Sequence, residues 1–502
     1  MTIPVPASAT NDKPNLLFVF TDQQRADSVG GIDGYTQTPN LDRLAARGMR
    51  FTKCITPAPV CMPARFSLLS GEYPHALGIA RNGPVELLGN APSWVRDLRD
   101  LGYRTAMIGK THYSPPFGNL AARAAKLHQL GFDDINEVAG PHGSITSSSM
   151  MTEWWKTEGV YDDFRTDLLE RKADCPWVVR PSPLGFDHYY DRYVGEKAVE
   201  YLKGYSDPRP WFCWVGFPGP HEPWDTPEPY ASLHDPRLAP APRPFPADLG
   251  TRPQGYLDQR RREVPEIASA HIARMRADYA GSISLIDAQL GAILDAIEAR
   301  GELDRTAIIF SSDHGEMNGD AGIVYKNVFL DGAVLVPLIV SVPGTGTGDP
   351  DVVSDPVELN AVGPTFLDLA SGGRTKEFGV ATSLLHEPRA PRDIAISRYA
   401  GEFMVTDGVR KLVVNADGSP YLLFDHSTDP TEATNRVTDP AMTDTIARLS
   451  EALLQRLVET MPRLPSEHVR RLGAQPATPT SFGRRVRRRL RAALGAKAQK
   501  RK

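Results

Sequence analysis

Cysteine is scarce in this chain, with four residues in 502. No two of them form a CxxC pair or a short repeated spacing, which argues against a disulfide framework and against a thiolate zinc site. The sequence therefore predicts a protein built for a reducing compartment. The four are Cys54, Cys61, Cys175 and Cys213.

A long apolar segment is also missing from the start of the chain. The first residues, MTIPVPASATNDKP, contain neither a basic region nor an apolar run. The apolar stretch Leu16–Phe20 that follows is too short for a signal segment or a membrane span. We therefore expect a cytoplasmic location.

Acidic residues are absent from the C-terminal end. Residues 484–502 carry ten Lys and Arg, so the rest of the chain has a net charge of −14 against −4 for the whole. Apolar residues recur every fourth position there, a pattern compatible with a basic amphipathic helix on an anionic membrane. We favour a disordered, solubilising tail over residues 466–502, and nucleic acid is not an expected partner. The apolar residues are Phe482, Val486, Leu490 and Leu494.

Continuous apolar runs alternate with amphipathic segments along most of the chain. Two of the runs end in carboxylates, Asp22 and Asp313, as expected of strands buried on both faces of a parallel sheet. The pattern predicts an α/β fold, with a large, mixed, mostly parallel sheet sandwiched by helices and chemistry at the carboxyl ends of the strands. The predicted strands are 15–22, 211–217 and 306–315, and the predicted helices are 39–47 and 277–300.

The pattern changes towards the C-terminus. Short apolar runs separated by turns at 394–399, 403–406, 411–415 and 421–425 predict strands, and 442–460 predicts a helix. These elements indicate a smaller antiparallel α+β domain. The predicted organisation is an extension at 1–14, a catalytic domain at 15–384, the small domain at 385–465 and the tail.

The stretch PVCMPARFSLLSG, residues 59–71, places a cysteine between two prolines. Pro59 and Pro63 are expected to hold Cys61 in an extended loop, with a helix beginning near Phe66. A helix N-terminus and the guanidinium of Arg65 would together favour an anion. On these residues alone, Cys61 is either an activated thiolate or a buried structural cysteine.

The surrounding motifs resemble those of the type I sulfatases of the alkaline phosphatase superfamily. The C-x-P-S/A-R-x4-T/S-G signature of that family is matched by Cys61–Arg65 followed by Ser70 and Gly71. Other matches come in the order of the family, from Pro14 to about Met461. They are Thr38–Leu44, Gly109–His112, Pro220–Pro223, Ser312–Glu316, Val336–Val340 and Phe424–Asn435.

The resemblance implies an alkaline phosphatase-like fold and the hydrolysis of a sulfate ester. It implies that Cys61 is oxidised to formylglycine (3-oxoalanine), whose hydrated aldehyde is the nucleophile, by a maturation enzyme that would be a partner. It also implies one divalent metal. Ca²⁺ is the first expectation, Mg²⁺ also suits the oxygen ligands, and the imidazole of His314 keeps Mn²⁺ open. The implied ligands are Asp22, Gln23, Cys61, Asp313 and His314.

The resemblance also assigns roles to single residues. Arg65, Lys110 and Lys326 would neutralise the sulfuryl oxygens. His221 would donate a proton to the leaving alkoxide, and His112 would act as the base that releases sulfate. Taken alone, His221 would be interpreted as a surface histidine and Lys326 as a solvated lysine. Asn82 is placed as a substrate contact, although its Asn-Gly sequence is also an ordinary turn.

Two departures from the family pattern concern the substrate. Ala321 stands where the family usually has His, and Leu335 where Arg is common. The substrate is expected to be a small-molecule or saccharide sulfate ester, and the sequence gives no oligomeric state. Two alternatives stay open, a phosphonate monoester or phosphodiester hydrolase on the same scaffold, and an unmodified, non-catalytic relative that binds anions or membranes.

Overall fold

The structure of the protein is a computed structural model. It describes residues 13–174, 177–247, 257, 260–261, 264, 266–345, 348–385, 394–461 and 467–472. Cys175 and the amphipathic pattern of the tail at 476–502 lie outside these residues. The predicted domain boundary near 385 lies at the edge of a segment outside them.

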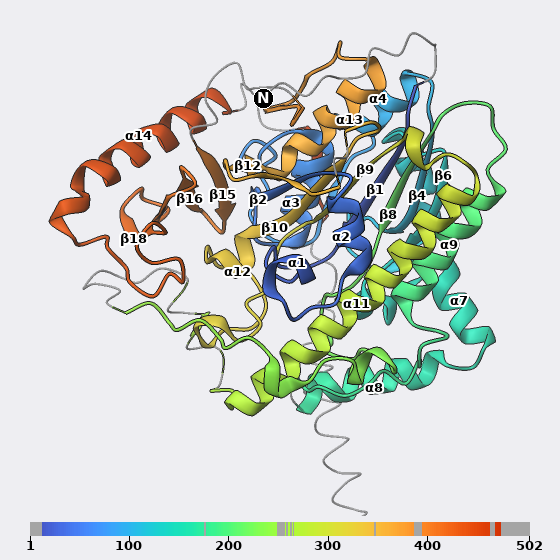
Figure 1. The fold of residues 1–502 in the computed structure, drawn as a ribbon, viewed down its shortest axis with the longest axis horizontal. Coiled ribbons are helices and arrows are strands. Elements are labelled where there is room, and N and C mark those ends of the chain that lie inside the picture. The colour runs from blue at the N-terminus through green and yellow to red at the C-terminus, as the bar shows by residue number, and fades with distance from the viewer. Residues whose placement is uncertain are drawn as a thin grey trace, which may run out of the picture.

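A nine-stranded mixed sheet forms the centre of the fold (Figure 1). β1 pairs in parallel with β8 and β9, and β4 pairs in parallel with β8 and β6, whereas β10 runs antiparallel to both β9 and β2. The strand order is β11 (Asp351–Val353), β2 (Gly48–Ile55), β10 (Leu335–Ser341), β9 (Thr306–Ser312), β1 (Asn15–Thr21), β8 (Trp211–Gly216), β4 (Arg104–Lys110) and β6 (Asp134–Val138), and β12 (Val357–Glu358) also pairs with β2. The predicted fold class is confirmed.

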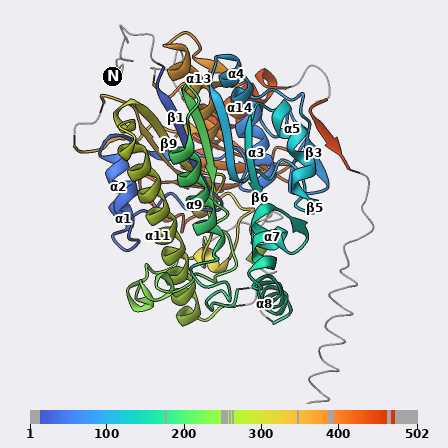
Figure 2. The ribbon, with the colours of Figure 1, turned by 90° about the vertical axis from the view of Figure 1, so that its right-hand side faces the viewer.

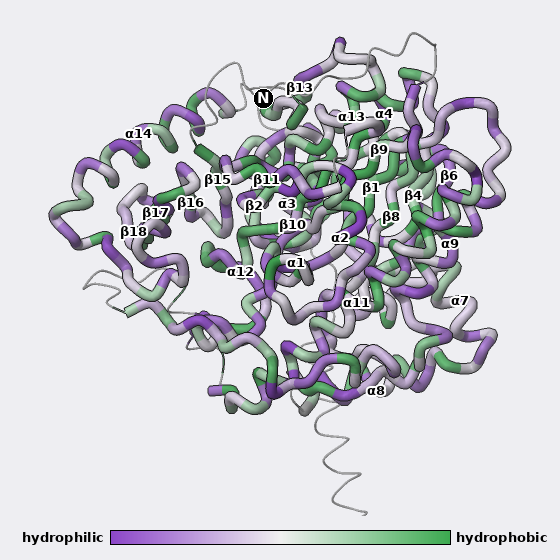
Figure 3. The backbone as a smooth tube through the Cα atoms, viewed as in Figure 1, coloured by the Kyte–Doolittle hydropathy of each residue, from purple (hydrophilic) through white to green (hydrophobic). Residues whose placement is uncertain are grey.

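Helices cover both faces of this sheet, and β1 shows why (Figure 2). Its residues alternate between two apolar clusters, with Leu16, Phe18 and Phe20 in one and Leu17 and Val19 in the other. A strand buried on both faces reads as a continuous apolar run, which is why the central strands are largely green in Figure 3. The first cluster is closed by α3 (Cys61–Ser70), α4 (Trp94–Asp100) and α13 (Val362–Ser371), and the second by α2 (Pro39–Ala45), α7 (Met150–Thr157), α8 (Tyr161–Asp174), α9 (Tyr190–Gly204) and α11 (Ser269–Ala299).

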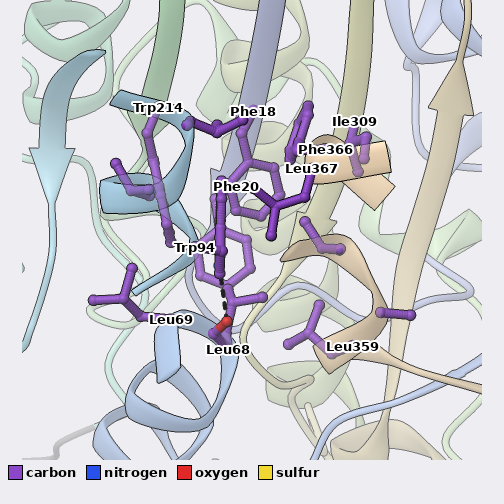
Figure 4. Close-up of a cluster of buried hydrophobic side chains, with 14 of the residues drawn as sticks. Phe18, Phe20, Leu68, Leu69, Trp94, Trp214, Ile309, Leu359, Phe366 and Leu367 are labelled. Atoms are coloured by element: carbon purple, nitrogen blue, oxygen red, sulfur yellow. Dashed lines mark hydrogen bonds between the residues drawn. The ribbon is translucent and has the colours of Figure 1, made fainter. Parts of the chain in front are cut away.

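Trp94 lies at the centre of the first cluster (Figure 4). Its ring stacks on Trp214 of β8 and on Phe366 of α13, with centroid distances of 5.6 and 5.5 Å. Its Nε1–H donates to the carbonyl of Leu68, at 3.0 Å, in α3. The indole therefore joins the sheet and the three helices of this face, and α3 carries Cys61.

α11 has the length and apolar composition of a membrane-spanning helix. However, 83% of its most apolar window is buried inside the fold, as in the core helix of a globular domain. The helix begins eight residues before the predicted start at 277, and it packs against α9 and α2.

The C-terminal region forms a four-stranded antiparallel sheet with α14 on one face (Figure 1). Its strands alternate in the same way: Val405 and Leu412 face α14, whereas Met404 and Val413 face the larger domain. The predicted strands and helix are confirmed within one or two residues. They are β15 (Ala395–Tyr399), β16 (Glu402–Thr406), β17 (Arg410–Val414), β18 (Pro420–Asp425) and α14 (Thr443–Glu459).

The remaining elements are short. One of them, β19, pairs antiparallel with β3 inside the segment predicted as a disordered tail, so that prediction is wrong for residues 469–471. The ladder of backbone hydrogen bonds supplied by β3 orders this stretch. The short elements are α1 (Gly30–Asp33), α5 (Ala124–Gln129), α6 (Pro141–Ser144), α12 (Asp331–Val334), β3 (Val85–Leu87), β5 (Gly118–Asn119), β7 (Ser147–Ser148), β13 (Glu377–Phe378), β14 (Ala381–Thr382) and β19 (Val469–Arg471).

Candidate active site

The carboxyl ends of the parallel strands meet at one edge of the sheet, and polar residues follow each of them. Asp22 follows β1, Asp313 and His314 follow β9, Lys110 ends β4, and His221 lies in the loop after β8. Since β1 pairs with both β8 and β9, and β8 with β4, these side chains are brought to the same edge. The predicted site residues therefore lie at one edge of the sheet, and their chemical roles stay predictions.

Cys61 is the first residue of α3, so the predicted helix start near Phe66 is wrong. Pro63 falls in the first helical turn, where its missing N–H has no intrahelical partner to lose. The side-chain oxygen of Asn82 accepts a hydrogen bond of 2.8 Å from the Met62 N–H. Asn82 therefore satisfies a free donor of the helix N-terminus, and it also lines the cavity described below.

Asp22, Cys61, Asp313 and His314 form a buried cluster of possible metal ligands, with one atom of each within 4.8 Å of the others. Cys61 Sγ lies 3.1 Å from His314 Nε2. The other ring nitrogen, Nδ1, donates to the Gly315 carbonyl at 2.9 Å, which turns Nε2 towards the cluster. Burial lowers the pKa of His314, but Asp313 and Cys61 outweigh it and raise that pKa to about 9. Two carboxylates and an oriented imidazole suit a divalent cation, and this donor set fits the implied metal.

Arg65 connects the carboxylates of this cluster. Its Nε donates to Asp313 at 2.7 Å, one terminal nitrogen donates to Asp22 at 2.9 Å, and the other donates to the Lys110 carbonyl at 3.0 Å. All four groups are fully or almost fully buried. Arg65 thus compensates the charge of the ligand set, while its predicted contact with sulfate oxygens stays a prediction.

The charges around the cluster favour anionic groups at Asp22 and Cys61. Burial raises the pKa of Asp22, but Lys110 and Arg65 outweigh it and hold that pKa below its ordinary value. Burial likewise raises the pKa of the Cys61 thiol, and Lys326 and His314 bring it well below the usual range. The site therefore stabilises negative charge at residue 61.

Lys326, His221 and Glu222 form a chain on the outer side of the cluster. Lys326 Nζ lies 2.7 Å from His221 Nε2, and because an ammonium only donates, Nε2 is the acceptor. His221 Nδ1 donates to the Glu222 carbonyl at 2.8 Å. Burial raises the pKa of Glu222, but His221 and Lys326 overcome it and lower that pKa to about 2. The structure thus brings His221 and Lys326 together as a hydrogen-bonded pair.

Gln23 has a left-handed backbone, with φ of 70°, and its amide joins three charged residues. Its Nε2 donates to Glu222 at 2.7 Å and to Glu316, and its Oε1 accepts from Lys326. Gln23 lies beside the cluster, and its predicted role as a metal ligand stays a prediction.

His112 also has a left-handed backbone, with φ of 61°. Burial lowers its pKa, and the cations Lys110 and Arg65 lower it further, whereas Cys61 raises it. Its Nδ1 is buried without a hydrogen-bond partner among the described residues. A neutral imidazole beside residue 61 suits the predicted role of a base.

A cavity of about 290 Å³ opens onto this arrangement. Six of the predicted residues line it, and three residues without a predicted role, Glu137, His142 and Glu222, line it as well. Glu222 belongs to the motif Pro220–Pro223, so the sequence could have indicated it. Glu137 lies near the carboxyl end of β6, and a prediction of that parallel strand would have placed Glu137 at this edge. The predicted residues are Cys61, Asn82, Lys110, His112, His221 and Lys326.

Two other groups of metal-type side chains occur in the described residues. His142, His221 and Glu222 line the same cavity, next to the ammonium of Lys326. Asp331, His426 and Glu432 surround Lys411, whose Nζ lies 2.6 Å from Asp331 and also bonds Glu432. The second group is therefore a buried ion-pair network.

Comparison with known proteins agrees with this arrangement. The chain is 28% identical over 467 residues to an arylsulfatase of Clostridium perfringens, covering 89% of this chain and 94% of that protein. It is 27% identical over 457 residues to a choline-sulfatase of Rhizobium meliloti, covering 86% and 84%.

A solved structure shares the fold. The phosphonate monoester hydrolase SpPMH from Silicibacter pomeroyi superposes with a TM-score of 0.75 at 24% identity, covering 92% of this chain and 99% of that one. The Sulfatase family model matches residues 14–373, which include every residue of the site. The chain therefore belongs to the sulfatase family, a family of sulfuric ester hydrolases.

Proposed function

We propose that this protein hydrolyses a sulfate ester to an alcohol and inorganic sulfate, with formylglycine at position 61 and one divalent cation. The observation that carries the proposal is the buried cluster of Asp22, Cys61, Asp313 and His314. Cys61 also lines a cavity whose wall contains lysines and histidines. A hydrated formylglycine would supply the nucleophile, and the cation would supply positive charge for the sulfate oxygens.

The cation would be held by Asp22, Asp313 and His314, with Gln23 and residue 61 as the further predicted ligands. Ca²⁺ is our first proposal; Mg²⁺ competes because it also prefers oxygen ligands, and Mn²⁺ competes because of the imidazole. Removal of the metal with a chelator is expected to abolish turnover. Add-back of each ion in turn would then identify the one that restores it.

The residues of the chain divide the remaining work. Lys110 and Lys326 present ammonium groups to the cavity and would orient the sulfate oxygens. His221, once protonated at Nε2, would donate that proton to the leaving alkoxide, with Lys326 beside it as the cation that orients the sulfate oxygens. His112, kept neutral by its surroundings, would take up the proton on release of sulfate.

Modification of Cys61 can be tested directly by the mass of the tryptic peptide Cys54–Arg65 from protein made in its native host. We expect the form in which CH2SH is replaced by CHO. A uniform thiol would reject the mechanism and favour the non-catalytic alternative. Cys61→Ala is the matched control, since it cannot be converted and should show no turnover.

A phosphonate monoester or phosphodiester hydrolase is the second candidate, and the shared fold of the Silicibacter pomeroyi enzyme keeps it open. The cationic pair of Lys110 and His112 is the feature by which we favour the sulfatase. Rates on an aryl sulfate and on the matching aryl phosphonate, measured with one matured preparation, separate the two. A strong preference for the phosphonate would reject the sulfatase proposal.

Three further expectations belong to the same proposal. The maturation enzyme that oxidises Cys61 would be a partner, the location would be cytoplasmic, and the basic tail would contact anionic membranes only if it forms the amphipathic helix. For the tail, truncation at residue 475 should abolish binding to anionic vesicles, and undiminished binding rejects the membrane contact.

A further inference from the structure

Glu137 is a carboxylate in the wall of the cavity that the proposed chemistry does not use. It lies in β6, where it pairs with Gly109 of β4, one residue before Lys110. The Thr111 hydroxyl donates to its Oε1. The sequence of β4 and β6 therefore places this carboxylate beside the segment that carries Lys110 and His112.

The second oxygen of Glu137, Oε2, is buried and has no hydrogen-bond partner among the described residues. A buried carboxylate oxygen without a donor is costly, typically by about 1–3 kcal/mol or more. Such an atom in the wall of a ligand cavity is commonly completed by the ligand. The burial of the group also raises the pKa of Glu137, although Thr111, Arg123 and Lys126 lower it.

Arg123 lines the same cavity, and its charge acts on Glu137. One of its terminal nitrogens donates to the Phe117 carbonyl, and no ion pair joins it to Glu137 in the described part of the chain. Lys126, the other cation near Glu137, lies 3.4 Å from Glu86 and also bonds Ser114. The wall therefore offers an acceptor on Glu137 and a donor on Arg123, each with capacity left.

The lining restricts what this part of the wall can recognise. Lys110, Arg123 and Lys326 are cationic, and among the described lining residues there is no Trp, Tyr or Phe. A quaternary ammonium group would be attracted by the carboxylates of Glu137 and Glu222, but it has no N–H to donate to Glu137 Oε2, and the lining offers it no Trp, Tyr or Phe ring. Neighbouring hydroxyl groups, by contrast, can donate to a carboxylate and accept from a guanidinium at the same time.

We propose that Glu137, with Arg123, forms a subsite for the hydroxyl groups of a saccharide sulfate ester, so that Glu137 determines substrate specificity. This inference rests on the proposed function, because it names the alcohol part of the same substrate. The sulfate group lies over residue 61, and the sugar ring extends towards β6 with a hydroxyl donating to Glu137 Oε2.

The test compares kcat/KM for a panel of pyranose monosulfates with kcat/KM for 4-nitrophenyl sulfate, which has no hydroxyl on its ring. A hydrogen bond to a charged group is worth about 1.5–3 kcal/mol, so Glu137→Gln should lower the ratio of the best saccharide to the aryl sulfate by about 10- to 100-fold. Arg123→Gln should lower the same ratio. Glu200→Gln, which changes a surface carboxylate paired with Lys197, should leave both rates as in the unchanged protein.

The outcomes separate the two proposals. If the matured protein turns over no sulfate ester, the proposed function fails. If it hydrolyses the aryl sulfate but no saccharide sulfate, or prefers choline sulfate, the subsite is rejected while the function stands. An equal loss on both substrates in Glu137→Gln, at an unchanged melting temperature, shows that Glu137 does not discriminate between them and overturns the proposal. If Glu137→Gln fails to fold, the ratio measured with Arg123→Gln decides.

Discussion

Arg65 has a role at the residue scale that its sequence motif did not reveal. Its guanidinium is buried and donates to Asp22, Asp313 and the carbonyl of Lys110, so it balances two carboxylates from strands almost 300 residues apart. Lys110 adds a second cation, 2.5 Å from Asp22. The two cations therefore offset the cost of burying the two carboxylates.

Replacement of Arg65 is expected to destabilise the protein as well as to inactivate it. Arg65→Met leaves two buried carboxylates without their common partner, and such losses cost about 3–5 kcal/mol. Urea denaturation of the purified protein would measure the change in the free energy of unfolding. Arg43→Met is the control, since Arg43 pairs with Asp295 and Glu298 at the surface and should change that free energy by about 1 kcal/mol or less. Equal losses in both variants would contradict this account of Arg65.

At the scale of elements, the site depends on how α3 is seated against the sheet. Trp94 of α4 stacks between Trp214 and Phe366, and it donates to Leu68 of α3 (Figure 4). The helix that begins with Cys61 is therefore fixed from behind by an indole on a different helix. Only the packed structure shows this support.

Trp94→Ala should lower the free energy of unfolding by about 3–5 kcal/mol, because it opens a cavity in the core and removes the bond to Leu68. The measurement is urea denaturation, monitored by far-ultraviolet circular dichroism so that the lost tryptophan does not alter the signal. Leu454 of α14 is 62% exposed, and Leu454→Ala should change the same quantity by about 0.5 kcal/mol or less. A loss below about 1 kcal/mol in Trp94→Ala would contradict the role of the indole.

α11 carries a pH-dependent element in Asp278. This carboxyl is buried beside Asp225 and accepts from the Thr226 hydroxyl at 3.1 Å, and Arg171 is the nearby cation. Burial, reinforced by the charge of Asp225, raises the pKa of Asp278 to about 7, and Thr226 and Arg171 offset only part of this rise. Because the folded pKa lies above the unfolded one, the group destabilises the protein as pH rises from about 4 through 7.

Asp278→Asn removes that ionisation. Relative to the unchanged protein, the variant should gain roughly 2–4 kcal/mol of unfolding free energy between pH 4 and pH 8. Thermal or urea unfolding at intervals across this range would measure the difference. Parallel stability profiles of the two proteins would contradict a raised pKa at this position.

At the scale of the whole molecule, the C-terminal sheet is joined to the larger domain by a buried ion network and an apolar cluster. Lys411 of β17 bonds Asp331 at the start of α12 and also Glu432, and Glu432 accepts from the Asp331 N–H at 2.8 Å. Met404, Val413 and further side chains pack around residues of the larger domain in the same region. The network therefore ties together segments about 80–100 residues apart.

Lys411→Met should destabilise the protein by about 3 kcal/mol, because it removes the buried cation between Asp331 and Glu432 and leaves the partly exposed His426 beside both. Adding Glu432→Gln to the same chain removes one of the two charges. The double variant should therefore recover about 1 kcal/mol or more in urea denaturation. If the two substitutions were simply additive, the coupling of these charges would be disproved.

Much of the site was predictable because its signals are local. Apolar runs that end in Asp22 and Asp313 identify buried strands, and the resemblance of the Cys61–Arg65 motif to the family signature implies the nucleophile position. Once these strands are parallel, their ends must meet, so the cluster of possible metal ligands follows from the order of the elements. The central elements and the C-terminal strands could be predicted for the same reason.

The tertiary structure alone decided which side chains touch. The start of α3 at Cys61, the cap that Asn82 gives it, the bond between His221 and Lys326, and the orphaned oxygen of Glu137 all depend on contacts between distant segments. Periodicity and motif spacing report the environment of a residue along its own element. They do not report its partner across the fold, because that partner is selected by packing in three dimensions.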